Sequence, residues 1–176
     1  PAATGWTGMT TTPTTTPSAT ATAATGEGTW TLVTDPTTLN GSDQVVYVAT
    51  ASDGTNYMLG NDNGTASAPT GDTCTISNGV ITSTVDASNI WYVEYGDSGY
   101  TFYTSTDKTA WLYSTNTNNG IRVGTNSNST FTMGGDGYLQ NNGTSRYLGV
   151  YTTNPDWRCY TSTTTNIGSQ TFAFYK

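Results

Sequence analysis

The stretch IWYVEYGDSGYTFYTS, residues 90–105, decides the fold class of this chain. Two runs rich in aromatic and β-branched residues, IWYVEY and YTFYTS, lie on either side of a short segment of Gly, Asp and Ser. Aromatic and β-branched residues are typical of strands, whereas clusters of Gly, Asp and Ser are typical of turns. The stretch therefore predicts two short strands separated by a turn.

The same pattern continues from Gly28 to the end of the chain. Fourteen segments of five to seven residues are bounded by Gly, Asn, Asp or Pro clusters: TWTLVT, QVVYVAT, NYMLG, TCTIS, GVITSTV, IWYVEY, YTFYTS, AWLYST, GIRVGT, TFTMGG, GYLQN, RYLGVYT, WRCYTS and TFAFYK. No window has the spacing of apolar residues that is typical of a helix. Charged residues make up only 10% of the chain, against about 25% in average soluble proteins. The sequence therefore predicts an all-β protein.

These segments divide into three similar thirds, at about residues 45–95, 99–133 and 137–176. In each third one aromatic residue opens a strand and a second opens another about ten residues later: Tyr47 and Tyr57, Tyr100 and Trp111, Tyr138 and Tyr147. Each third closes on a polar-x-aromatic step, NIW, STF or QTF. Four strands per third favour a single β-trefoil-like domain. A two-sheet β-sandwich, which has the same spacing of short strands, is the alternative.

The N-terminal segment, residues 1–28, has a different composition from the β-rich domain at 29–176. Its central part, MTTTPTTTPSATATAATG, carries no charge and too few large side chains to form a core. Such a segment serves as a stalk, with O-glycosylation expected on its threonines. Alternatively, it adds as an extended strand to the sheet edge of a neighbouring molecule, anchored by Trp6 and Met9. The candidate O-glycosylation sites are Thr11, Thr12, Thr14, Thr15 and Thr16.

Net charge and hydropathy restrict the partners. The chain carries a net charge of −7, and its five Lys and Arg residues are scattered, so we expect no nucleic-acid partner. No run approaches the roughly 20 apolar residues that span a bilayer, so we expect no membrane span. The chain begins at Pro1 without Met or an apolar signal region, which we interpret as a processed chain. Low charge and many hydroxyl groups indicate an extracellular or cell-surface protein.

The residues present leave little catalytic chemistry. The chain contains no His, which excludes Ser-His-Asp and Cys-His mechanisms within it. Glycoside hydrolysis needs two opposed carboxylates, and Glu94 with Asp97 is the one conceivable pair. The Asp and Asn residues between Asp53 and Asn63 lack the ligand order of a calcium loop and are typical of turns. We therefore predict that the protein is not an enzyme and has neither a cofactor nor a metal site.

Two cysteines and one cluster of aromatic residues remain as candidate sites. Cys74 and Cys159 either form a disulfide in an oxidising compartment or are buried free thiols. Near Pro155 the sequence places three aromatic residues that are candidates for stacking on a glycan, Tyr151, Trp157 and Tyr160. Alternation in WRCY puts Trp157 on the same face as Cys159, so Trp157 is also a core candidate.

The segments TWTLVTDPTTLNGSDQVVYVA, GYTFYTSTDKTAWLYS, RYLGVYTTNPDWRCYTS and FAFYK carry a resemblance to a known module. From Thr29 to Lys176 the chain resembles a β-rich module that recurs in secreted and cell-surface proteins of the Bacteroidetes group. The resemblance implies that location and a β-rich fold, and it implies no particular activity. A weaker resemblance is to ricin-type lectin trefoils, whose repeats end in Gln-x-Trp. Here QTF keeps the Gln, and no third has both Gln and Trp.

Two functions follow as hypotheses. The first is a non-catalytic extracellular structural protein, a surface or filament subunit that assembles with copies of itself through its N-terminal segment. The second is a lectin-like module or adhesin that binds a carbohydrate or a host surface. The first predicts soluble monomers after removal of residues 1–25, and the second predicts exposed aromatic residues beside a shallow cleft.

Overall fold

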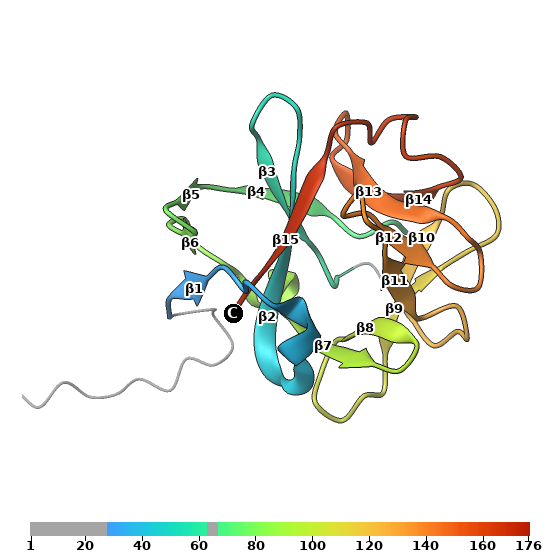
Figure 1. Cartoon of the computed structure of the whole chain (residues 1–176), viewed down its shortest axis with the longest axis horizontal. Helices are drawn as coiled ribbons and strands as arrows, with labels where there is room; N and C mark the ends of the chain where they lie inside the picture. The colour runs from blue at the N-terminus through green and yellow to red at the C-terminus, as the bar shows by residue number, and fades with distance from the viewer. Residues whose placement is uncertain (1–27, 63–66) are drawn as a thin grey trace, which may run out of the picture.

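The computed structural model describes residues 28–62 and 67–176, and it is all-β over these ranges (Figure 1). Two 3₁₀ helices, η1 (Pro36–Thr38) and η2 (Ala87–Asn89), accompany the strands, and the described residues contain no α-helix. None of the helices in the described ranges has the length and apolar character needed to cross a membrane. The all-β prediction is confirmed. The candidate anchors and O-glycosylation sites at residues 6–16 lie outside the described residues.

Fifteen strands form two sheets within the described ranges. The smaller sheet has the order β1-β6-β5 and consists of β1 (Trp30–Thr31), β5 (Ile76–Ser77) and β6 (Val80–Ile81). The larger sheet has twelve strands. They are β2 (Asn40–Thr50), β3 (Asn56–Leu59), β4 (Gly71–Cys74), β7 (Trp91–Gly96), β8 (Gly99–Tyr103), β9 (Trp111–Ser114), β10 (Ile121–Gly124), β11 (Phe131–Met133), β12 (Leu139–Asn141), β13 (Tyr147–Tyr151), β14 (Asp156–Tyr160) and β15 (Thr171–Tyr175).

Pairing in the larger sheet follows one scheme in two groups of four strands and recurs in part in a third group, β12 to β15, and every pair is antiparallel. In the first group β2 pairs with β3 and β7, and β3 pairs with β4. In the second group β8 pairs with β9 and β11, and β9 pairs with β10. In the third group β12 pairs with β13, and β13 pairs with β14. The pairs β7 with β8, β11 with β12 and β15 with β2 join the groups.

The two ends of the described domain meet. Figure 1 shows β15 beside β2 at the centre of the molecule, with the C-terminus next to β1. The backbone N–H of Thr31 donates to the carbonyl of Lys176 at 3.0 Å, and the N–H of Lys176 donates back to Thr31 at 2.8 Å. The small sheet, which contains β1, is therefore attached to the large sheet through the last strand of the chain.

Three hairpins, β3–β4, β9–β10 and β13–β14, converge on one side of the larger sheet. The backbone N–H of Trp157 donates to the carbonyl of Pro69 at 2.9 Å, and that of Gly71 donates to Pro155 at 3.2 Å. The N–H of Cys159 donates to the carbonyl of Asn119 at 3.0 Å. Hairpin β13–β14 is thus hydrogen-bonded both to the segment leading into β4 and to the turn of β9–β10.

All three groups of four strands contribute to a common core. Tyr47 lies inside it with its ring centroid 4.7 Å from that of Phe174, 5.3 Å from Phe102 and 5.7 Å from Trp157. Aromatic side chains dominate the energetics of a core because each buries a large apolar area, and pairs of rings add about 0.5–1.5 kcal/mol. The largest fully buried side chains include Trp91, Trp157, Tyr47, Phe102, Phe131 and Phe174. The core therefore depends on residues from one end of the domain to the other.

Candidate functional site

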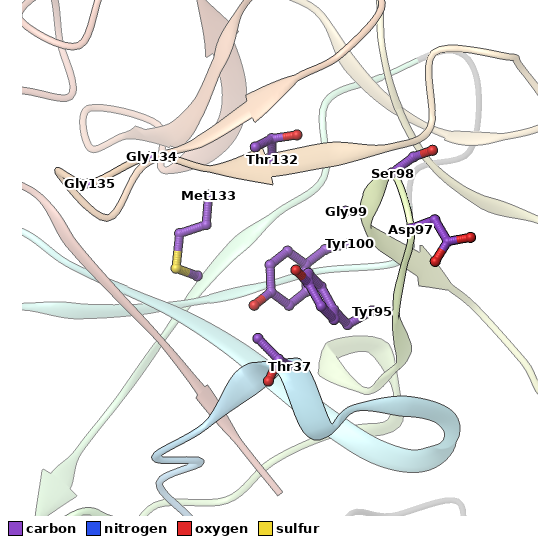
Figure 2. Close-up of a pocket in the computed structure, with 10 residues that line it drawn as sticks. All are labelled: Thr37, Tyr95, Asp97, Ser98, Gly99, Tyr100, Thr132, Met133, Gly134 and Gly135. Atoms are coloured by element: carbon purple, nitrogen blue, oxygen red, sulfur yellow. The ribbon is translucent and has the colours of Figure 1, made fainter.

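A shallow pocket of about 410 Å³ opens at the end of the β7–β8 hairpin (Figure 2). Three parts of the chain form it: η1, the hairpin, and the end of β11 with the two glycines that follow it. Within the described residues only three large hydrophobic side chains are exposed, and two of them, Tyr95 and Met133, line this pocket. We call it the Tyr95 pocket.

The hairpin presents one tyrosine to solvent and supports it with another. Tyr95 pairs with Tyr100 across the hairpin, and their ring centroids lie 4.8 Å apart. The Tyr95 side chain is exposed, whereas Tyr100 is buried and its ring lies 5.4 Å from that of Phe174 in the core. The Tyr95 N–H also donates to the carbonyl of Leu39 at 2.9 Å. The exposed ring is thus held against the core through a buried one.

Hydrogen bonds fix the other walls of the pocket. Asp35 caps η1 by accepting the backbone N–H of Thr37 at 3.1 Å, which sets the position of Thr37. On the far side the amide of Asn142 donates to the carbonyl of Ser98 at 2.7 Å and accepts the hydroxyl of Thr132 at 2.7 Å. The hairpin turn and the end of β11 are therefore held together by one side chain.

The centre of the pocket is formed by uncharged side chains, and Asp97 is the one charged residue among the described residues of its lining. In Figure 2 the side chains of Tyr95, Tyr100, Thr37 and Met133 gather in the middle, and the side chain of Asp97 points away from them. Burial raises the pKa of Tyr100 above its ordinary value, and the charges of Tyr95 and Asp35 raise it further. The Tyr100 phenol therefore stays protonated at neutral pH. The arrangement can offer an apolar ring face with neutral hydroxyl groups around it.

The conceivable pair of carboxylates, Glu94 and Asp97, lies on β7 and at the turn of the β7–β8 hairpin. Glu94 accepts a hydrogen bond from the ammonium of Lys108 at 2.9 Å and does not line the Tyr95 pocket, whereas Asp97 does. Within residues 28–62 and 67–176 no three His, Cys, Asp or Glu side chains form a group that could hold a metal ion.

The Asp and Asn residues after β2 take part in local hydrogen bonds. Asp53 accepts the backbone N–H of Thr55 at 2.9 Å, as turns require, and Asn61 donates to the carbonyl of Ile90 at 2.8 Å. Asp62 accepts the hydroxyl of Thr70 at 3.1 Å. Asn63 lies outside the described residues. The side chains that the structure describes here hold turns and neighbouring segments together.

The predicted glycan-stacking cluster at the end of the chain needs correction. Trp157 is completely buried, and its indole N–H donates to the carbonyl of Met58 at 3.0 Å. Tyr160 is also buried, at 3% exposed. The ring of Tyr151 is half-buried and lies 4.3 Å from the guanidinium carbon of Arg158. Trp157 belongs to the main hydrophobic cluster, and Tyr160 packs with Tyr138 and Ile167 in a smaller cluster on the other face of β14. Because both side chains are buried, neither presents a ring face on which a glycan could stack.

The two cysteines do not form a disulfide in the structure, which leaves the alternative of buried free thiols. Cys74 and Cys159 are buried free thiols and belong to different hydrophobic clusters. Burial raises the pKa of Cys74 to about 11 and that of Cys159 to about 12. Such thiols are poor nucleophiles, because the thiolate is the reactive form.

Tyr95 was missed by the sequence analysis, although a signal for it exists. Alternation along β7 places Tyr95 on the same face as Trp91 and Val93, which are both buried. Tyr95 is the last residue of that face before the turn, where the core ends, and its side chain is 43% exposed among the described residues. An aromatic residue that continues a buried face up to a Gly-Asp-Ser-Gly turn is therefore a candidate for an exposed ring.

In comparisons with known proteins, no protein-family model and no curated protein matches the sequence.

Proposed function

We propose that this chain is a carbohydrate-binding module and that the Tyr95 pocket is its binding site. The observation that carries the proposal is the exposed ring of Tyr95, 4.8 Å from the buried ring of Tyr100 and beside a shallow hollow. A pyranose has an apolar face of C–H groups and an edge of hydroxyl groups. A ring held rigidly at a protein surface matches that face at little entropic cost.

The polar groups around the ring support a neutral sugar as the ligand. The Thr37 hydroxyl donates to Asp35 at 2.6 Å, so its oxygen is available as an acceptor for a sugar hydroxyl. The two tyrosine hydroxyls can donate and accept. No Lys or Arg lines the pocket, so the site offers no counter-charge for a carboxylate or a sulfate. A small number of polar groups beside an apolar surface is typical of ligand sites.

We propose in addition that the larger sheet is a β-trefoil. The pairing scheme shared by its groups of four strands supports this architecture, with β2, β7, β8, β11, β12 and β15 as the central ring. One pairing of that ring, between β12 and β15, is missing among the described pairs. The two-sheet count favours the sandwich alternative. A crystal structure with β12 paired to β15 would support the trefoil, and one with them in separate layers would support the sandwich.

Secretion and assembly stay predictions from the sequence. The proposed location is extracellular, on the grounds of low charge and abundant hydroxyl groups. Assembly through residues 1–28 concerns Trp6 and Met9, which lie outside the described residues. The binding module is our first proposal because described side chains carry it.

Tyr95→Ala tests the proposed site. The full chain is first screened on a glycan array, and the affinity for the strongest neutral glycan is then measured by calorimetry. We expect Tyr95→Ala to weaken binding about tenfold or more, because it removes the stacking surface. The control is Tyr151→Ala, which changes a half-buried tyrosine elsewhere and should leave the affinity unchanged. A folded wild-type chain that binds no glycan, or a Tyr95→Ala variant with wild-type affinity, would refute the proposal.

A further inference from the structure

A second hollow, of about 330 Å³, lies where the three hairpins converge. Each hairpin contributes to it. Ser67 comes from the segment that leads into β4, Arg122 and the two residues Asn118 and Asn119 come from β9–β10, and Arg158 comes from β14. We call it the hairpin pocket. It is separate from the Tyr95 pocket and shares none of its lining residues.

The hairpin pocket gathers most of the positive charge of the chain. The whole sequence has five Lys and Arg residues and a net charge of −7. Arg122 and Arg158 line the pocket, and Arg146 donates to the side-chain oxygen of Asn119 at 3.0 Å and to the carbonyl of Asn116 at 2.8 Å. Three of the five cations, from separate segments, therefore surround one turn.

Charge pairing distinguishes these arginines from the other cations. Lys108 pairs with Glu94 and Lys176 with Asp43. Arg158 pairs with Asp156, the one acidic residue in the lining of the pocket. Among the ion pairs of the described residues, Arg122 and Arg146 have no carboxylate partner. Of the two cations that lack a carboxylate partner, Arg122 lines this pocket and Arg146 is hydrogen-bonded to Asn119 in its lining, which leaves a local excess of positive charge in an acidic protein.

The hydrogen bonds of these side chains leave donors for a ligand. A guanidinium carries five N–H groups. Arg122 donates within the described residues to the carbonyl of Ile121 at 2.7 Å. Arg158 uses its Nε and one Nη on Asp156, at 2.7 and 3.2 Å, and its stacking on Tyr151 fixes the plane of the fork. Planar donors held in this way match the oxygens of carboxylate, sulfate and phosphate groups.

We propose that the hairpin pocket binds an oxyanion, the carboxylate or sulfate group of an acidic glycan, with Arg122 and Arg158 as its main donors. The amide of Asn118 and the hydroxyl of Ser67 supply neutral donors at the rim. Arg146 is a positioning residue, because its hydrogen bonds to Asn119 and Asn116 hold the turn that lines the pocket. This site does not rest on the proposed function, because no residue of the Tyr95 pocket takes part in it.

The test is an NMR titration of the full ¹⁵N-labelled chain at constant ionic strength. One arm uses sodium sulfate and a second uses glucuronate, with sodium chloride and glucose as their controls. We expect sulfate and glucuronate to shift the amide signals of Asn118 and Asn119 saturably, and chloride and glucose to leave them in place. A response to sulfate alone would assign the site to inorganic anions and overturn the glycan part of the proposal.

Variants separate the site from general charge effects. Arg122→Gln should weaken sulfate binding at least tenfold, which is the loss expected for a charge-assisted hydrogen bond. Arg122→Lys keeps the positive charge but lacks the planar set of guanidinium donors. Its sulfate affinity should therefore lie between those of the wild type and Arg122→Gln. Lys108→Gln removes one positive charge elsewhere, and Tyr95→Ala removes the other candidate site, so both should bind sulfate as the wild type does. Wild-type affinity in a folded Arg122→Gln variant, or equal shifts with chloride, would overturn the proposal.

Discussion

At the scale of single residues, the thiol of Cys159 shows how burial couples protonation to folding. The folded chain holds its pKa at about 12, against an ordinary value of 9.0, because the side chain is wholly buried. Between those two values the unfolded chain loses the proton and the folded chain keeps it. Unfolding therefore releases protons in this range, and the free energy of unfolding falls as the pH rises.

We expect Cys159→Ser to make the stability of the chain less dependent on pH above pH 9. Urea unfolding of wild type and variant, measured with a reducing agent between pH 7 and about 11, gives the comparison. Cys74→Ser should have a smaller effect, since the pKa of Cys74 rises only to about 11. Tyr47, whose pKa is also raised by burial, contributes to the remaining slope in every variant. Equal slopes in wild type and Cys159→Ser would contradict the expectation.

Single residues also show which structural features the alternation of the sequence predicts and which it does not. Alternation predicts which side chains share a face, and it correctly grouped Trp157 with Cys159. It does not predict where the core ends along that face. Trp157 is buried because hairpin β13–β14 packs against the segment leading into β4, whereas Tyr95 lies near the end of its strand and stays 43% exposed. The candidate site could not be derived because it depends on that difference.

At the scale of the elements, the approach of β8 to β11 forms one side of the Tyr95 pocket. Tyr100 pairs with Phe131, and Gly99 lies just before this pair with φ at +122°. A Cβ atom at Gly99 would lie 2.2 Å from the carbonyl oxygen of Phe131, which is far inside van der Waals contact. The two strands can therefore approach only because residue 99 is a glycine.

Gly99→Ala should lower the free energy of unfolding by about 2 kcal/mol or more, because it combines a steric clash with an unfavourable φ. Gly96→Ala is the matched control. It lies across the same turn, and a Cβ there would meet nothing within 4 Å. The readout is the urea midpoint of both variants at pH 7. A wild-type midpoint for Gly99→Ala would mean that β8 and β11 do not approach as described.

Most strands could be predicted, but their partners and some of their boundaries could not. TCTIS reads as one strand, yet the chain leaves the larger sheet after Cys74 and enters the smaller sheet at Ile76. The backbone N–H of Thr75 donates to the hydroxyl of Ser83 at this point. Likewise, the pairing of β15 with β2 joins residues more than a hundred positions apart. Local propensity carries no information about such contacts.

At the scale of the whole molecule, the two proposed binding sites are separate hollows of one acidic domain. The Tyr95 pocket has uncharged groups at its centre. The hairpin pocket is lined by Arg122, which is in none of the ion pairs of the described residues, and by Arg158, which pairs with Asp156. If both proposed sites bind sugars, a glycan long enough to reach both would gain affinity from engaging them together.

Assembly is also a property of the whole molecule, and removal of residues 1–25 tests it. If the N-terminal segment adds as a strand to a neighbouring copy, electron microscopy of the full chain should show regular filaments, and the truncated chain should be monomeric. The truncated domain should keep its circular dichroism spectrum, since residues 28–62 and 67–176 contain every strand described. Filaments formed equally by both chains would exclude the segment as the joint, and monomers in both samples would exclude assembly.

The meeting of the domain ends has a consequence for how the fold is connected. Because Thr31 and Lys176 exchange both backbone hydrogen bonds, a short linker could connect residue 176 to the start of the β-rich domain in a variant that lacks residues 1–28. New ends could then be opened at the exposed turn Asp53–Gly54, and every strand would keep its present neighbours. In this circular permutant the first strand of the domain would be β3. The order of the strands along the chain would change, whereas their pairing in the fold would not.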